Sequence, residues 1–281
     1  MSHRTFIGAI VLATAFSILA TAASAFDESK YPAFQGQWKR KPGTSVNSWD
    51  ESKRGGLAQE PPLTPEYRKL WESSMADQAA GGQGADLRYT CVSNGMPRMA
   101  TIVRQLEFFI HPEITLIVFE NNLPRRIYTD GRGFNATDNV PSYNGYSIGK
   151  WIDTDGDGKF DVLDVETRNF KGARLYDQTG IPLHHDNQSI IHERMYIDKS
   201  NPDTLVNEIT VTDNALTRPW KVVKNYRREK NAEWYEDLCS ENNNHVVIGK
   251  ENYFMSADGY LMPAKKDQQP PDLRYFKKAG N

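Results

Sequence analysis

The chain has 281 residues, a formal net charge of −2 and two cysteines. Its 34 basic and 36 acidic residues are mixed along the chain, so no basic stripe is available to neutralise phosphates and nucleic acid is not expected as a partner. A chain of this length can bury one large core, and all-β barrels of this size commonly form a single domain.

Residues 1–25 have the pattern of an export signal. Arg4 lies in a short polar start, an apolar stretch runs from Phe6 to Ala20, and the small residues Ala23 and Ala25 suit signal peptidase. The alternative is an uncleaved membrane anchor, but the stretch is short for a span of about 20 residues. We therefore expect cleavage after Ala25 and a periplasmic or secreted protein that does not span the membrane.

Both cysteines, Cys91 and Cys239, lie after this signal. In an oxidising compartment they predict one disulfide, which would stabilise the fold by about 5 kcal/mol because it closes so long a loop. The alternatives are two separate thiols or one reactive cysteine. No Cys-His pair has zinc-ligand spacing, so zinc is not expected.

The predicted elements begin with an extended N-terminal arm over residues 26–62, rich in Gly, Pro, Ser and charge. A helix follows, because Thr64 is a good N-cap, Pro65 suits the first turn and Glu66 favours the positive helix end. We expect it to end at the glycine pair 81–82. Its apolar face would contain Tyr67, Leu70, Trp71 and Met75.

After Cys91 the pattern changes to strands separated by Pro, Gly, Asn and Asp clusters. Residues 204–212 show this best, since one face is mostly apolar and the other mostly polar. No strand-helix-strand alternation occurs, so a parallel sheet is disfavoured. The predicted strands are Met99–Phe109, Ile114–Glu120, Arg125–Thr129, Tyr146–Ile152, Phe160–Thr167, Ser189–Ile197, Thr204–Thr212, Trp220–Tyr226 and Trp234–Cys239.

These strands predict a mainly β fold, an antiparallel lipocalin-like (calycin-type) barrel preceded by one helix. Helix and barrel would form one domain over residues 63–266. The Gln-, Pro- and Lys-rich residues 267–281 would form a loosely held tail.

An Asp-rich loop at residues 153–161 has oxygen ligands at alternate positions and glycines for a tight turn, as Ca²⁺ requires. The loop is not an EF-hand, because its predicted flanks are strands and the twelfth position, counted from Asp153, is Asp164 instead of a long Glu. The loop resembles the calcium hairpins of FG-GAP and thrombospondin-type repeats. That resemblance implies as ligands Asp153, Asp155, Asp157, the backbone carbonyl of Lys159, and Asp161. The alternative is an ordinary solvated turn.

Candidate pocket residues come from the segment 124–132. On a strand, Arg126, Tyr128 and Asp130 share one face, while Arg125 and Ile127 alternate with them. Facing a barrel interior, this polar trio would either recognise an anion or form a buried salt-bridge network. Further aromatic residues are expected to line a pocket or the core, chiefly Trp151 and Trp220.

Candidate catalytic residues are a separate set. His titrates near pH 7 and a neighbouring carboxylate can orient it. The set is Tyr128, Asp130, His184, His185 and Glu193. Surface or hydrogen-bonding roles are the alternative for the histidines. The chain has no Gly-x-Ser-x-Gly elbow, phosphate-binding glycine loop, dinucleotide fingerprint or His-Glu-x-x-His motif, so no nucleotide cofactor is expected.

Five motifs together resemble a family of secreted proteobacterial and acidobacterial proteins with a predicted lipocalin-like β-barrel. They are Gly95–Met99, Arg125–Arg132, Gly145–Trp151, Glu193–Arg194 and Thr217–Trp220. The resemblance covers about residues 60–248 and implies the barrel, but it implies no reaction. Members of that family carry a short Glu-Gly-Asp hairpin where this chain has its Asp-rich loop, so calcium binding would belong to a subgroup.

Three functions follow as hypotheses. The first is a barrel that binds a small, partly apolar molecule, aromatic or anionic, with Arg126 and Tyr128 at the polar end of its cup. The second is an enzyme on the same barrel that performs acid–base chemistry such as hydration, isomerisation or hydrolysis. The third is a structural or envelope-associated protein. The sequence does not predict an oligomeric state.

Overall fold

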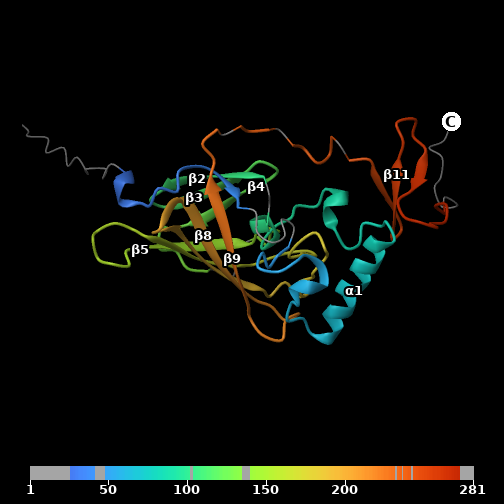
Figure 1. Cartoon of the computed structure of the whole chain (residues 1–281), viewed down its shortest axis with the longest axis horizontal. Helices are drawn as coiled ribbons and strands as arrows, with labels where there is room; N and C mark the ends of the chain where they lie inside the picture. Colours follow the sequence, from blue (N-terminus) through green and yellow to red (C-terminus); the bar gives the residue numbers. More distant parts are fainter. Residues whose placement is uncertain are drawn as a thin grey trace, which may run out of the picture.

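The computed structural model describes residues 26–41, 48–101, 104–134, 140–231, 233–235, 237–241 and 243–272. The predicted signal therefore lies outside the described residues. Nine strands close into a barrel (Figure 1), which confirms the predicted fold class. They are β1 (Gly36–Arg40), β2 (Gln105–His111), β3 (Ile114–Phe119), β4 (Asn122–Tyr128), β5 (Tyr146–Ile152), β6 (Val162–Arg168), β7 (Ile190–Asp198), β8 (Asn201–Thr212) and β9 (Trp220–Arg228).

The barrel is antiparallel except at one seam. Neighbouring strands follow the chain order, and β1 closes the ring by pairing with both β2 and β9. A ring with an odd number of strands cannot alternate in direction all the way round, so one pair must be parallel. That pair is β4 and β5, where Ile127 lies opposite Ser147.

Side chains alternate between the barrel interior and its outer surface as predicted. In β8, the predicted apolar face is buried at Leu205, Ile209 and Val211, and Asn207 is buried with them. The core extends beyond the strands because the N-terminal arm adds large aromatic residues. Phe34, Trp38 and Trp49 are all fully buried.

The N-terminal arm, predicted as an extended segment, contributes a strand to the barrel. Its residues Gly36–Arg40 form β1, with Trp38 and Arg40 turned inward. On either side of β1, Phe34 packs against Trp151, and Trp49 packs against Trp220. The arm completes the barrel and fills part of its interior.

The single α-helix of the described residues is α1 (Pro65–Ala79), which confirms the predicted start and the stop before Gly81. Tyr67 and Trp71 are buried as expected, but Leu70 is 54% exposed, so its place on the buried face was wrong. Ser74 lies on that face instead and donates a hydrogen bond to the Thr179 carbonyl at 3.2 Å. The face of α1 that packs against the rest of the protein is thus narrow and partly polar.

A second, three-stranded antiparallel sheet lies apart from the barrel, near the C-terminal end of α1 (Figure 1). It consists of β10 (His245–Ile248), β11 (Glu251–Met255) and β12 (Leu261–Pro263) and was not predicted. The predicted strand Trp234–Cys239 is wrong, because its described residues form no strand. The second sheet lies within residues 63–266, which the sequence analysis assigned to one barrel domain.

Cys91 and Cys239 form the predicted disulfide, with their Cα atoms 5.6 Å apart. It anchors the long connection from β9 to β10 beside a short 3₁₀ helix, η3 (Leu87–Thr90). The start of the predicted loose tail is also held, because Gln268 Nε2 donates to the Asn252 carbonyl at 2.8 Å. Residues 273–281 lie outside the described residues. Among the described residues, no helix is long and apolar enough to cross a membrane.

Candidate functional site

A small hollow lies inside the barrel, with a volume of about 20 Å³ and room for about one water molecule. Most of its wall is apolar, and three of the lining residues come from the segment before β2 that contains the 3₁₀ helix η4 (Arg98–Thr101). The apolar lining residues are Met96, Met99, Ala100, Leu106, Phe108, Ile117, Phe119, Met195 and Leu205. The polar lining residues are Arg125, Glu193, Asn207 and Tyr226. A mostly apolar wall with a few polar groups is the usual composition of a ligand site.

The polar side is built on an ion pair between Arg125 of β4 and Glu193 of β7. Both side chains are buried, and two guanidinium nitrogens donate to the two carboxylate oxygens, Nη1 to Oε1 at 3.1 Å. Arg125 also donates to Ser147 Oγ at 3.2 Å and to Thr167 Oγ1 at 2.9 Å. The charge of each partner is thus matched inside the barrel, as a buried pair requires.

Asn207 of β8 and Tyr226 of β9 complete the polar wall. The Asn207 amide donates from Nδ2 to Glu193 Oε1 at 2.9 Å, while its Oδ1 is buried and has no hydrogen-bond partner among the described residues. The Tyr226 hydroxyl donates to the Ala100 carbonyl at 2.9 Å. Burial raises the pKa of Tyr226, so this hydroxyl stays protonated at neutral pH.

A second buried charged cluster lies where the arm enters the barrel. Lys224 of β9 is fully buried, and its Nζ donates to the carbonyl of Trp49 and lies 3.4 Å from Glu51 Oε1. Arg40 Nε lies 3.3 Å from the same Glu51 oxygen. Burial lowers the pKa of Lys224 to about 8, while Glu51 acts in the opposite direction. This cluster holds the arm and does not line the hollow.

The predicted polar trio of β4 does not face the interior. Arg126 is exposed, and the Tyr128 ring stacks on Tyr146 with centroids 5.1 Å apart. Asp130 pairs with Arg132, whose guanidinium lies 3.9 Å from the Tyr128 ring centroid. The predicted interior face was wrong because the apolar face of β4 is the one that contains Ile127, and Arg125 shares it.

Trp151 and Trp220 are buried as expected, but neither lines the hollow. Trp151 packs edge-on against Tyr31, with ring centroids 5.2 Å apart. Trp220 packs against Tyr176 at 5.1 Å and against Trp49 at 6.2 Å. Both tryptophans anchor loops and the arm.

The structure does not bring the five candidate catalytic residues together. Glu193 is inside the barrel, and Tyr128 and Asp130 lie on the outer side of the β4 end. His184 and His185 lie in a loop beside α1 with their rings stacked at 4.3 Å. The Tyr67 hydroxyl lies 2.7 Å from His185 Nδ1, and His184 Nδ1 lies 3.0 Å from Asp186. The contact between Tyr67 and His185 connects the loop to α1.

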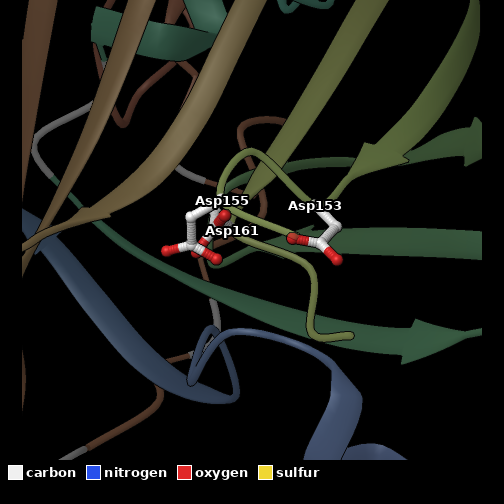
Figure 2. A group of neighbouring side chains, drawn as sticks. All are labelled: Asp153, Asp155 and Asp161. Carbon is white, nitrogen blue, oxygen red and sulfur yellow. The ribbon is translucent and has the colours of Figure 1, made fainter. Parts of the chain in front are cut away.

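In the Asp-rich loop between β5 and β6, Asp153, Asp155 and Asp161 each offer an oxygen within 4.8 Å of the others (Figure 2). Asp161 Oδ2 accepts hydrogen bonds from Thr154, which hold the pKa of Asp161 below its usual value. Asp157 is not part of this group and accepts from the Lys159 amide at 2.8 Å. The loop gathers three of the four predicted carboxylates.

Comparison with protein-family models, with curated proteins and with solved structures finds no match to this chain. The resemblance carried by the five motifs therefore stays a prediction. Sequence reasoning missed Arg125 as an interior residue, and it placed Asn207 on the apolar face of its strand without naming it as a site residue. A signal was present for each, since Arg125 shares its strand face with Ile127 and Asn207 shares its face with Leu205 and Ile209.

Proposed function

We propose that this barrel binds a small, partly apolar molecule in its interior hollow. The observation that supports the proposal is the composition of the wall, in which nine apolar side chains surround the space and four polar ones converge on one side. Ligand sites in proteins commonly combine a mostly apolar lining with a few fixed polar groups.

The size of the hollow requires that the wall adapts. Met96, Met99 and Met195 contribute three flexible side chains to it. Methionine has three rotatable bonds and a polarizable sulfur, so it repacks around differently shaped guests at low cost. Met96 and Met99 lie in the segment before β2, so we infer that a ligand enters on that side.

Native mass spectrometry of the protein purified from its own host tests this proposal. We expect a retained small molecule in the wild type and in Arg126→Ala, because Arg126 is exposed on the outer surface. Ala100→Leu adds three carbon atoms to the hollow, so it should lose the molecule while remaining folded by circular dichroism. Equal retention in Ala100→Leu would place the binding site elsewhere and contradict the proposal.

We further propose that the protein is periplasmic or secreted, with residues 1–25 removed after Ala25. The disulfide supports this, because such bonds form and persist in oxidising compartments. N-terminal sequencing of the exported protein should begin at Phe26. A start at Met1 in the purified protein would contradict it.

Calcium binding by the Asp-rich loop is also proposed, as a stabilising site and not as a catalytic one. The alternating carboxylates and glycines of residues 153–161 support it, since hard oxygen ligands on a tight turn suit Ca²⁺. Asp153, Asp155 and Asp161 would be among its ligands. We expect the melting temperature to be higher with millimolar calcium than with EGTA. Asp155→Asn should reduce the difference, and Asp164→Asn, just outside the loop, should keep it. An unchanged wild-type midpoint would contradict the calcium proposal.

A further inference from the structure

The wall of the barrel hollow offers one unused hydrogen-bonding atom. Asn207 is 4% exposed and lines the hollow. Its Nδ2 donates to Glu193, and a carboxylate only accepts, so this contact fixes the orientation of the amide and leaves Oδ1 as the atom without a partner. A buried acceptor without a donor is costly, so an occupant that donates a hydrogen bond gains by satisfying it.

The charged groups of the same wall are already matched. Glu193 accepts hydrogen bonds from Arg125 and from Asn207. Arg125 also donates hydrogen bonds to Ser147 and Thr167. A charged ligand would have to break this buried pair or remain unpaired in an otherwise apolar space, and both alternatives are unfavourable. The wall therefore disfavours an anion, even though an arginine lies in it.

From these two observations we propose that the ligand is a neutral molecule with an apolar body and one hydrogen-bond donor, of the phenol or alcohol class. Its hydroxyl donates to Asn207 Oδ1, and its apolar part contacts Met96, Met99 and Met195. This inference rests on the proposed interior binding site and narrows its ligand class.

The test uses four probes that share one benzene ring. Toluene offers no hydrogen bond, phenol donates one, anisole only accepts, and benzoate carries a negative charge. Binding to the full oxidised protein is followed by NMR of ¹³C-labelled methionine methyl groups. Met96, Met99 and Met195 line the hollow, whereas Met75, Met255 and Met262 lie elsewhere and serve as internal controls.

We expect phenol to shift the three lining methyl groups and to bind about tenfold more tightly than toluene or anisole, with benzoate weakest. In Asn207→Leu the affinity for phenol should fall to that for toluene. Arg126→Ala should leave all four affinities unchanged. The wild-type comparison decides the question even if Asn207→Leu does not fold.

Two results would overturn the inference and leave the interior site standing. One is equal affinity for phenol and toluene at the lining methyl groups, and the other is tightest binding of benzoate there. If no probe shifts Met96, Met99 or Met195, the interior site itself is contradicted, and the inference with it.

Discussion

Arg125 and Arg126 are neighbours in β4 with opposite surroundings. Arg125 is buried and paired with Glu193, whereas Arg126 is exposed. Arg125→Met leaves the Glu193 carboxylate buried without its cation, so we expect the free energy of unfolding to fall by about 3–5 kcal/mol in urea titrations. Arg126→Met, the matched control, should change it by less than about 0.5 kcal/mol.

A second substitution distinguishes an unpaired charge from lost packing. Arg125→Met combined with Glu193→Gln removes both charges, so it should recover part of the stability that Arg125→Met alone loses. If the double variant is as unstable as the sum of the two single variants, the ion pair is not the cause.

The same two residues show what a sequence can predict about a site. The alternation in β4 was evident, but the choice of interior face rested on the polar residues Arg126, Tyr128 and Asp130. The apolar neighbour decides the face, because Ile127 must be buried and Arg125 follows it. Partners such as Ser147 and Thr167 lie on strands that only the closed barrel brings to Arg125.

At the scale of elements, local pattern predicted α1 and most of the barrel strands, but not β1. Only Trp38 is apolar among Gly36–Arg40, and a strand with so little alternation has no clear signal. Its position depends on pairing with β2 and β9, and Arg40 is buried there because Glu51 of the same arm reaches it. The pairing joins β1 to strands that lie far from it in the sequence, so the local pattern of residues does not predict it.

The contact between this arm and Lys224 of β9 predicts that the free energy of unfolding depends on pH. The pKa of Lys224 is lowered from 10.5 to about 8, so between these values the unfolded chain binds more protons than the folded protein. Stability should therefore rise with pH over this window, by about 2 kcal/mol by pH 10. Above pH 10 the raised pKa of Tyr176 and of Tyr226 lowers the stability, while burial of Arg174, which lowers its pKa to about 10, acts in the opposite direction.

Urea unfolding at pH 7 to 11 measures this rise. Lys224→Met should remove it, and Lys221→Met, an exposed lysine of the same strand, should keep it. A flat profile in the wild type between pH 8 and 10 would show that Lys224 stays charged when buried, held by Glu51 and the Trp49 carbonyl.

At the scale of the whole molecule, the sequence predicted the disulfide but not what it connects. The chain leaves the barrel at β9 and reaches β10–β12 by a long connection across the molecule (Figure 1). Cys239 attaches that connection to Cys91. The strands of the second sheet are only three to five residues long, too short for a clear alternation, and Val247, Tyr260 and Met262 remain exposed.

A three-stranded sheet is stable by itself only when it has a hydrophobic face or packs against a helix. In this sheet Val247, Met255 and Met262 are exposed, so its stability depends on contacts with the rest of the protein. Its contacts with the rest of the protein include the Tyr89 ring, 4.5 Å from the His245 ring, and an ion pair of 3.4 Å between Lys265 and Asp77. The disulfide strengthens the effect of these few contacts. It keeps β10 close to η3 when the contacts break, so the second sheet loses less conformational entropy when it docks again.

Removal of the disulfide should therefore open the second sheet before the barrel. In Cys91→Ser/Cys239→Ser we expect amide hydrogen exchange in β10 and β11 to accelerate roughly thirty- to a thousandfold, equivalent to about 2–4 kcal/mol. Exchange in β7 and β8 should stay nearly unchanged, since the barrel is closed by its own strand pairs. Mass spectrometry of the wild type and of the double variant after timed labelling measures this, with reduced wild type as a second test. Equal acceleration in barrel and sheet would instead make the disulfide a constraint on the whole fold, with the two sheets unfolding as one unit.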